Sequence, residues 1–490
     1  MAYAYLYTTE KEGNPFYKDE KIFNIILKGV QALRDFQYPD GQFEFIKTDG
    51  SKWGPIYMPW TFYHWLETYE IMKNYLPDNV RGDWETGLMP AFISFSQRDN
   101  NYLHNIPLWN SMSLHRAGII FNNDNWKKHA DVLFQKAVEE QHPDGYWEEH
   151  GGPTVTYNYV YIHAMGLYRF HGGSIDVTEA LRKSAMFHQA FTYPDGSTVE
   201  TIDGRVKYRK VEKRYSTTGL TGLLATSAGI SYIYSLLNLF SKDRISLPHT
   251  TSLLIMLDNI LDNSNVDFID NFAGYANFTN ESLELIHGKG SIIRKANRQV
   301  VLSSYTVPLC DSRWALDRQS FISIWDKNSG LILGSGNSKY QPGHSSFVIC
   351  GKDGNVISYT PLSARHLSLG EVELLYYGAR CTIKARIDDS GAILITYGAQ
   401  KAEDFLSWYI NIPLKPQFNN SVAEIKEYKQ DDKNVVEFSG IYLSFQEDYK
   451  ITAPSFPFNP YAKDGSSSIE EAAAVLTIYP KKDSISIKIV

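Results

Sequence analysis

Hydrophobic positions follow two different patterns along the 490-residue chain, and the pattern changes after about residue 245. Before that point, apolar residues recur every three or four positions, which is typical of one face of an α-helix. Two such stripes are Ile22, Ile25, Ile26, Gly29, Val30 and Leu33, and Trp126, Ala130, Leu133, Phe134, Ala137 and Val138. The first half of the chain is therefore predicted to be helical.

After about residue 290 the chain consists of short alternating runs broken by turn residues, the pattern of antiparallel strands. Three hairpins are predicted: Phe321–Trp325 with LILG, SFVIC with VISY, and ARID with AILITYG. The last residues, Ser484–Val490, alternate strictly. This region is predicted to be a sandwich of antiparallel sheets. The boundary falls between about 242 and 290, and we divide the chain into 1–245 and 246–490.

A weak internal repeat marks the helical half. Pro-Asp-Gly occurs with its aspartate at Asp40, Asp144 and Asp195, spacings of 104 and 51 residues. A unit of about 52 residues, with one copy degraded, fits a pair of helices followed by a turn. Such hairpins stack into a solenoid or close into an incomplete ring, an α/α toroid, whose connecting loops form a cleft at one end.

Composition limits the classes of partner. The net charge is −7 and the pI about 6.0, so the chain lacks the basic surface that nucleic acids and anionic membranes require. An anionic ligand would have to meet a local group of cations. Aromatic residues make up 14% of the chain, with 33 Tyr. That excess fits either a large core or a cleft that stacks on sugars, and composition leaves both open.

Three further features concern compartment and membrane. Cys310, Cys350 and Cys381 are far apart and odd in number, so we expect buried thiols in strands and no disulfide framework. The first residues show no signal-peptide pattern, although a removed leader would leave no trace. The uncharged stretch Tyr215–Ser241 is long enough to cross a bilayer, but its Ser, Thr, Gly and Asn favour a buried helix.

Candidate chemistry begins with two aromatic and polar segments. Trp53–Trp65 contains Trp60 and His64, and its flat side chains could stack on sugar rings or pack into the next helix. In Tyr102–His115, Pro107 can occupy the first turn of a helix. His104 and Asn105 then lie at the mouth of a cleft, with Asn110, Ser111 and His115 further along. Asn105 could equally be a helix cap.

Two more segments follow. In Asp144–Tyr168 a Gly-Gly-Pro break precedes a helix whose first turns carry Tyr157, Asn158 and Tyr159, with His163 on the face of Tyr159. Glu200–Tyr215 concentrates cations and either attracts an anionic substrate or forms a solvated charged face. The cations are Arg205, Lys207, Arg209, Lys210, Lys213 and Arg214, and Tyr208 lies among them. Signatures of nucleotide, phosphoryl-transfer, zinc-protease and serine-hydrolase chemistry are missing.

Together these features resemble the polysaccharide lyases that combine an α/α toroid with a C-terminal β-sandwich, the heparinase II/III and alginate lyase type. Asn105 precedes Tyr157 by 52 residues and Tyr159 by 54, a separation similar to that family's Asn and Tyr. The resemblance implies β-elimination in a uronate-containing anionic polysaccharide. It implies a catalytic domain over 1–245 and a sandwich over 246–490, and it requires no metal.

The resemblance also implies roles. Asn105 with His104 would neutralise the substrate carboxylate, and Tyr157 or Tyr159 would act as base and acid. Arg205 with Lys207 would bind substrate carboxylates. The family's His-rich stretch has its nearest match at Tyr340–Phe347, which holds one histidine and no Asp, so zinc is unsupported there. The further substrate-binding candidates are Trp60, His64, Asn110, His115, His163, Tyr208 and His344.

Two other functions remain open from the residues alone. A glycoside hydrolase on the same helical ring would need a pair of carboxylates. The candidate carboxylates are Asp40, Glu44, Asp144, Glu148, Glu149, Asp195 and Glu200. The aspartates among them recur at each Pro-Asp-Gly turn, and a role in forming the turn explains this recurrence more simply than catalysis does. A non-catalytic carbohydrate-binding protein would use only the aromatic groove. The oligomeric state is not indicated.

Overall fold

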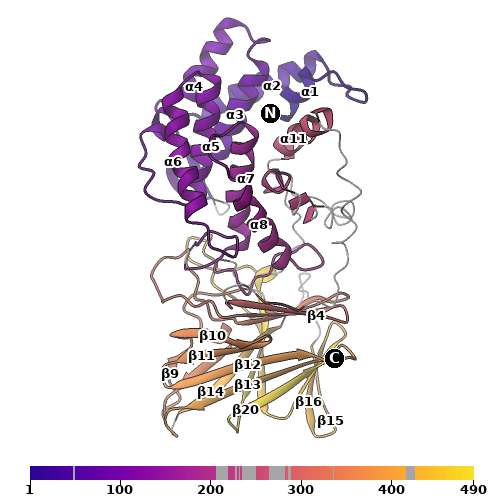
Figure 1. The fold of residues 1–490 in the computed structure, drawn as a ribbon. Helices are drawn as coiled ribbons and strands as arrows, with labels where there is room; N and C mark the ends of the chain where they lie inside the picture. The colour runs from indigo at the N-terminus through magenta and orange to yellow at the C-terminus, as the bar shows by residue number, and fades with distance from the viewer. Residues whose placement is uncertain are drawn as a thin grey trace.

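A computed structural model describes residues 1–47, 50–149, 151–205, 219–226, 229–230, 232–233, 250–263, 282–284, 288–334, 336–404, 406–414 and 425–490, with the backbone alone for 260–263 and 282–284. A helical N-terminal region is followed by a region of antiparallel sheets (Figure 1). The two predicted halves are therefore present, in the predicted order.

Helices that follow one another in the chain pack together in the N-terminal region, as α3 does with α4, α5 with α6, and α7 with α8 (Figure 1). A short hairpin of two strands, β1 (Phe43–Ile46) and β2 (Lys52–Ile56), precedes the first pair. The helices are α1 (Ala2–Thr8), α2 (Glu20–Phe36), α3 (Pro59–Met72), α4 (Asp78–Ser96), α5 (Asn105–Ile120), α6 (Asp124–Glu139), α7 (Val155–Phe170), α8 (Thr178–Ala190), α9 (Leu220–Leu223) and α11 (Thr250–Asn263).

The predicted helical stripes are largely confirmed. Helix α2 buries Ile22, Ile26 and Val30, a seam with a spacing of four residues. Ile25 was expected in that stripe but is 45% exposed, because the buried seam of this helix is narrower than the apolar pattern. The stripe of α6 is buried from Trp126 to Ala137.

The three Pro-Asp-Gly turns have one backbone design. Each begins just after a helix, namely α2, α6 and α8, and in each the glycine has a positive φ of 82–92° that favours the residue without a side chain. The same hydrogen bond, an amide to a carbonyl four residues later at 2.8 Å, closes all three. It joins Tyr38 to Gln42, His142 to Tyr146, and Tyr193 to Ser197. The predicted repeat of helix and turn is confirmed at these places.

Two antiparallel sheets form the C-terminal region. The first has the order β18-β19-β14-β7-β6-β5-β4-β3, with β8 joining β14 and β9 joining β8. Its strands are β3 (Ser282–Glu284), β4 (Gly290–Lys295), β5 (Arg298–Ser303), β6 (Ile322–Asp326), β7 (Gly330–Leu333), β8 (Phe347–Cys350), β9 (Val356–Ser358), β14 (Ser407–Leu414), β18 (Asp448–Ser455) and β19 (Ala473–Tyr479). Two short 3₁₀ turns, η1 (Pro342–His344) and η2 (Ile469–Glu471), lie in the connections.

The second sheet has the order β10-β11-β12-β13-β20-β17-β16-β15. The last strand in sequence, β20, thus lies between β13 and β17 in its interior. The strands are β10 (Ser363–Ser368), β11 (Glu371–Tyr376), β12 (Ala379–Ile387), β13 (Ile393–Lys401), β15 (Lys426–Gln430), β16 (Lys433–Phe438), β17 (Ile441–Phe445) and β20 (Ser484–Ile489).

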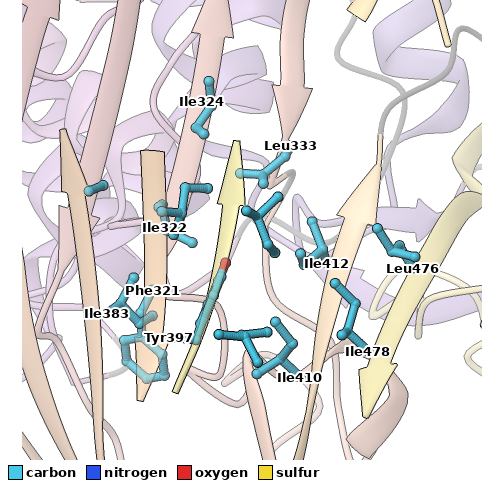
Figure 2. Close-up of a cluster of buried hydrophobic side chains, with 14 of the residues drawn as sticks. Phe321, Ile322, Ile324, Leu333, Ile383, Tyr397, Ile410, Ile412, Leu476 and Ile478 are labelled. Carbon is cyan, nitrogen blue, oxygen red and sulfur yellow. The ribbon is translucent and has the colours of Figure 1, made fainter. Parts of the chain in front are cut away.

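The sandwich core lies between these sheets. Figure 2 shows Ile383 and Tyr397 of one sheet and Ile324, Ile410 and Leu476 of the other in one buried cluster. The three predicted hairpins are confirmed as β6–β7, β8–β9 and β12–β13. The strict alternation at the end of the chain is confirmed in β20, where every second residue is buried.

A separate apolar cluster joins the helical and β regions. Phe187 and Phe191 of the α8 end pack in it with Tyr305 and Trp325 of the β region. The Trp325 Nε1 also donates to Asp195 in the third Pro-Asp-Gly turn, at 3.2 Å. This contact fixes the loops at one end of the helix pairs against the first sheet.

Cys350 and Cys381 are buried in β8 and β12, but Cys310 is exposed in the β5–β6 loop, so its predicted burial is wrong. The division after residue 245 stays a prediction; α11 lies beyond it and contacts α9. Most of Tyr215–Ser241 lies outside the described residues. None of the helices in the described ranges combines the length and apolar character of a membrane span.

Candidate active site

The start of helix α5 presents two polar side chains to one carboxylate. His104 is the N-cap residue and Asn105 the first residue of the helix, with Pro107 in its first turn. Asn105 does not cap the helix with its side chain; its Nδ2 donates to Glu149 Oε1 at 2.9 Å. His104 Nε2 lies 2.9 Å from the same oxygen. Asn105 is therefore not a helix cap, and its side chain instead reaches a residue that is distant in sequence.

Glu149 is the centre of this cluster. It follows the second Pro-Asp-Gly turn, and its side chain is 1% exposed. Arg205 Nη1 lies 3.0 Å from the same Oε1, so three donors converge on one oxygen. Thr154 Oγ1 donates to the other oxygen at 3.4 Å. Burial raises the pKa of this carboxyl, but His104, Arg205 and Asn105 outweigh it and hold the pKa below its ordinary value.

The loop that carries Arg205 is fixed by Asp203. One Asp203 oxygen accepts the main-chain N–H of Arg205 at 2.9 Å, and the other accepts that of Thr156 in the first turn of α7 at 3.2 Å. The buried Asn337 of the β region donates to the Asp203 carbonyl at 3.2 Å. Arg205 is thus held beside α7 by contacts from both regions of the chain.

Tyr157, in the first turn of α7, lies next to this cluster. The Arg205 guanidinium lies 4.0 Å from the centre of the Tyr157 ring, a cation–π contact. The hydroxyls of Tyr157 and Tyr461 share a hydrogen bond of 2.6 Å across the two regions. Burial and the Tyr461 hydroxyl raise the pKa of Tyr157, while Arg205 lowers it, and the net shift is upward. Tyr157 is therefore a neutral phenol at rest.

Tyr159 points elsewhere, although it is only two residues away. Its hydroxyl shares a 2.9 Å hydrogen bond with the Tyr232 hydroxyl, and its ring stacks on His188 at 3.8 Å. Tyr232 in turn bonds Thr192 at 2.7 Å. Burial first, and then Tyr232, hold the pKa of Tyr159 well above its ordinary value. Tyr159 belongs to a buried network behind the cluster.

Other predicted site residues pack inside the helical region. The Trp60 ring meets Trp109 edge-on at 4.5 Å, and His64 Nδ1 donates to the Trp60 carbonyl at 2.7 Å. The His163 ring stacks on the Trp109 ring, with 4.9 Å between the ring centres. His115 Nε2 donates to the His171 carbonyl at 3.4 Å. No contact among the described residues brings these four side chains to Glu149.

Of the remaining predicted residues, Asn110 and His344 are described by the structure, and Lys207 and Tyr208 are not. Asn110 is buried in α5, where its amide has no hydrogen-bond partner among the described residues. His344 is buried at η1, with Nε2 3.4 Å from Ser455 Oγ. Lys207 and Tyr208, like the other cations of 206–215, lie outside the described residues. In the described part of the chain no group of three or more His, Cys, Asp or Glu side chains could hold a metal ion.

The sequence analysis gave Glu149 a different role and missed two aromatic residues that border the site, Tyr461 and Trp314, whose ring lies 5.1 Å from the Arg205 guanidinium. Glu149 was considered only as a hydrolase carboxylate, whereas it accepts from all three donors. Trp314 and Tyr461 were not singled out; each is an aromatic residue in a loop of the β region, and no local pattern distinguishes them. A buried Glu with three donor contacts is a long-range feature that spacing does not reveal.

Solved structures share this architecture. A heparinase III matches with a TM-score of 0.52, covering 88% of this chain and 67% of its own at 14% identity. A chondroitin AC lyase variant from Streptomyces coelicolor matches with a TM-score of 0.53, covering 100% of this chain and 74% of its own at 11% identity. A heparan sulfate lyase from Pedobacter heparinus matches with a TM-score of 0.52, covering 99% of this chain and 74% of its own at 12% identity. The chain has a polysaccharide-lyase fold.

The predicted fold class, an α/α toroid followed by an antiparallel β-sandwich, is thereby confirmed. No protein-family model matches the sequence, and no curated protein matches it. At these identities the likeness concerns the fold and does not extend to the residues of a site. What those residues do must be argued from their own geometry.

Proposed function

We propose that this protein is a polysaccharide lyase that cleaves a uronic-acid-containing anionic polysaccharide by β-elimination. The observation that carries the proposal is the convergence of His104, Asn105 and Arg205 on one buried oxygen, beside Tyr157, in a chain with a lyase fold. These donors stand where the helical and β regions meet.

The reaction explains why such donors are needed. β-Elimination removes the C5 proton of a uronate, which is alpha to a carboxylate, and expels the oxygen at C4. The carboxylate charge must be offset, because a full negative charge makes this C–H bond a very weak acid. Asn105 keeps a second amide hydrogen, and Arg205 keeps further N–H groups, besides those directed at Glu149. Donors preorganised around developing negative charge stabilise a transition state strongly.

Tyr157 is the better placed of the two candidate tyrosines for proton transfer. It borders Arg205, and its hydroxyl shares a hydrogen bond with that of Tyr461, an exposed side chain. After its own proton has passed to solvent, the Tyr157 phenolate, which the Arg205 charge favours, can take the C5 proton. The phenol formed in this way can then protonate the leaving oxygen at C4. Tyr159, engaged with Tyr232 and His188, supports the start of α7 from behind.

A glycoside hydrolase is less well supported. Its general acid requires a carboxyl group with a raised pKa. The pKa of Glu149 is lowered instead. Asp40 and Asp195 each accept an N–H within their own turns, at 3.0 Å, as turn-forming residues do.

The test is a panel of heparan sulfate, chondroitin sulfate, hyaluronan and alginate, followed by ultraviolet absorbance. An unsaturated uronate product, which absorbs, is the expected result for at least one polymer. New reducing ends without absorbance would indicate a hydrolase, and binding without cleavage would indicate a carbohydrate-binding protein.

The tyrosine assignment is tested on the cleaved polymer. Tyr157→Phe should lower kcat by about 100-fold or more, as loss of a general acid and base does. Tyr159→Phe should cost less, because its ring contact with His188 remains. Tyr377→Phe, an exposed tyrosine of the sandwich, is the control. An unchanged rate in Tyr157→Phe would rule out its role.

A further inference from the structure

An aromatic surface leads away from the Glu149 cluster. The half-buried Trp314 ring, in the β5–β6 loop, lies 5.1 Å from the Arg205 guanidinium. It also lies 5.4 Å from Tyr461 and 5.4 Å from Trp53. Trp314 is therefore the junction between the proposed catalytic group and a series of rings from different parts of the chain.

These rings come from both regions of the molecule. Trp53 lies in β2 of the small N-terminal hairpin, and its ring is 5.0 Å from that of Phe45 in β1. Trp314 and Tyr461 come from two loops of the β region. The two that end the series are open to solvent, with 54% of Trp53 and 42% of Tyr461 exposed. Large exposed aromatic side chains in one contiguous group mark a binding surface.

Cations flank the same rings. The Arg205 guanidinium lies over both Tyr157 and Trp314. The Arg313 guanidinium lies 5.4 Å from the Trp314 ring and donates to the Ala462 carbonyl beside Tyr461. Aromatic faces suit the C–H surface of a sugar ring, and guanidinium groups suit carboxylate or sulfate. Arg205 already pairs with Glu149, whereas the hydrogen bond of Arg313 goes to a neutral carbonyl, so an anionic sugar can still pair with the Arg313 charge.

We propose that Trp53, Trp314 and Tyr461 form a subsite that stacks on a sugar unit of an anionic polysaccharide next to the bond that is cut. This inference rests on the proposed function and adds to it where the neighbouring unit is held. Because the surface combines the N-terminal hairpin with two β-region loops, binding there spans both regions of the chain.

The experiment uses the full chain with Trp53→Ala, Trp314→Phe and, as a matched control far from the rings, the exposed Tyr377→Ala. If a polymer is cleaved, Trp53→Ala should raise KM about three- to tenfold while kcat stays within about twofold. Trp314→Phe should raise KM less, because a ring is kept. Tyr377→Ala should match the wild type.

If a polymer is bound but not cleaved, the same factors should appear in Kd by calorimetry, and the subsite would stand while the lyase function fails. If cleavage occurs but both Trp variants keep the wild-type KM, the subsite is wrong and the lyase function stands. If the wild type binds no polymer of the panel, both are wrong. A carboxyl-reduced polymer should bind more weakly; equal affinity would overturn the anionic assignment.

Discussion

Arg318, in the β region, donates a hydrogen bond of 2.9 Å from Nη2 to the main-chain carbonyl of Pro153, just before helix α7. Its Nη1 donates to the Ile202 carbonyl at 2.6 Å. A Cβ on Gly152 or Gly204 would come within 2.8 or 2.4 Å of the same guanidinium. One buried side chain therefore holds both loops that deliver Glu149 and Arg205.

Replacing Arg318 by Met should lower the free energy of unfolding by about 3 kcal/mol or more, because two hydrogen bonds from a charged group are lost. Urea denaturation measures the change. Arg365→Met is the control, since that side chain is 67% exposed and should cost less than about 0.5 kcal/mol. Equal stability of the two variants would show that Arg318 does not hold the loops.

Replacing Glu149 by Gln should lower the free energy of unfolding by about 2 to 4 kcal/mol, because the buried Arg205 guanidinium loses its carboxylate partner. The pKa of Glu149 is lowered in the folded state, so its contribution is present above about pH 4.5 and is lost as pH falls through the folded pKa. The difference in the free energy of unfolding between wild type and Glu149→Gln should therefore become smaller only in acid. Glu148→Gln, at the exposed neighbouring position, should show no such gap in thermal melting.

His188 should make the protein sensitive to mild acid. Burial lowers its pKa to about 3, and its Nε2 lies 2.9 Å from the Asn158 amide nitrogen, so the folded state holds the neutral ring. Its contribution is complete above the unfolded pKa of about 6.5 and is lost as pH falls towards 3. Between these values wild type should lose about 1.4 kcal/mol per pH unit relative to His188→Gln. Parallel stability curves for the two proteins would contradict this.

Gly145→Ala should be the more damaging of two matched glycine substitutions. Gly145 has φ +92°, and an added Cβ would lie 2.2 Å from the Lys183 carbonyl oxygen in α8. Gly172 has φ +73° with nothing within 4 Å, so Gly172→Ala meets only the backbone strain of about 1 to 2 kcal/mol. The Gly145 variant should lose several kcal/mol more in urea denaturation. Equal losses would mean that the turn does not pack tightly on α8.

Local features of this fold could be predicted because they depend on near neighbours in sequence. The Pro-Asp-Gly turns need a glycine with positive φ, and Pro107 needs a helix start, so both could be read directly. The hairpin of β12 and β13 follows from alternation around a short turn. Ile25 shows the limit, since an apolar residue in the right period is still exposed when no neighbour covers it.

The candidate site could be predicted only in part. His104, Asn105 and Tyr157 stood out because they lie at helix starts after loop residues. Their common partner Glu149 and the ring of Tyr461 did not, because contacts across 44 and 304 residues depend on how the whole chain packs. Tyr157 and Tyr159 also diverge, because residues two apart lie on nearly opposite faces of a helix and meet different neighbours.

The position of β20 bears on how the chain folds during synthesis. Residues 484–489 supply an interior strand, paired with β13 on one side and β17 on the other. The helical region leaves the ribosome earlier, whereas this sheet keeps two strand edges unpaired until β20 emerges. Unpaired edges favour pairing between chains. A nascent chain halted just before residue 484 would therefore leave the edges of β13 and β17 open to pairing with other chains.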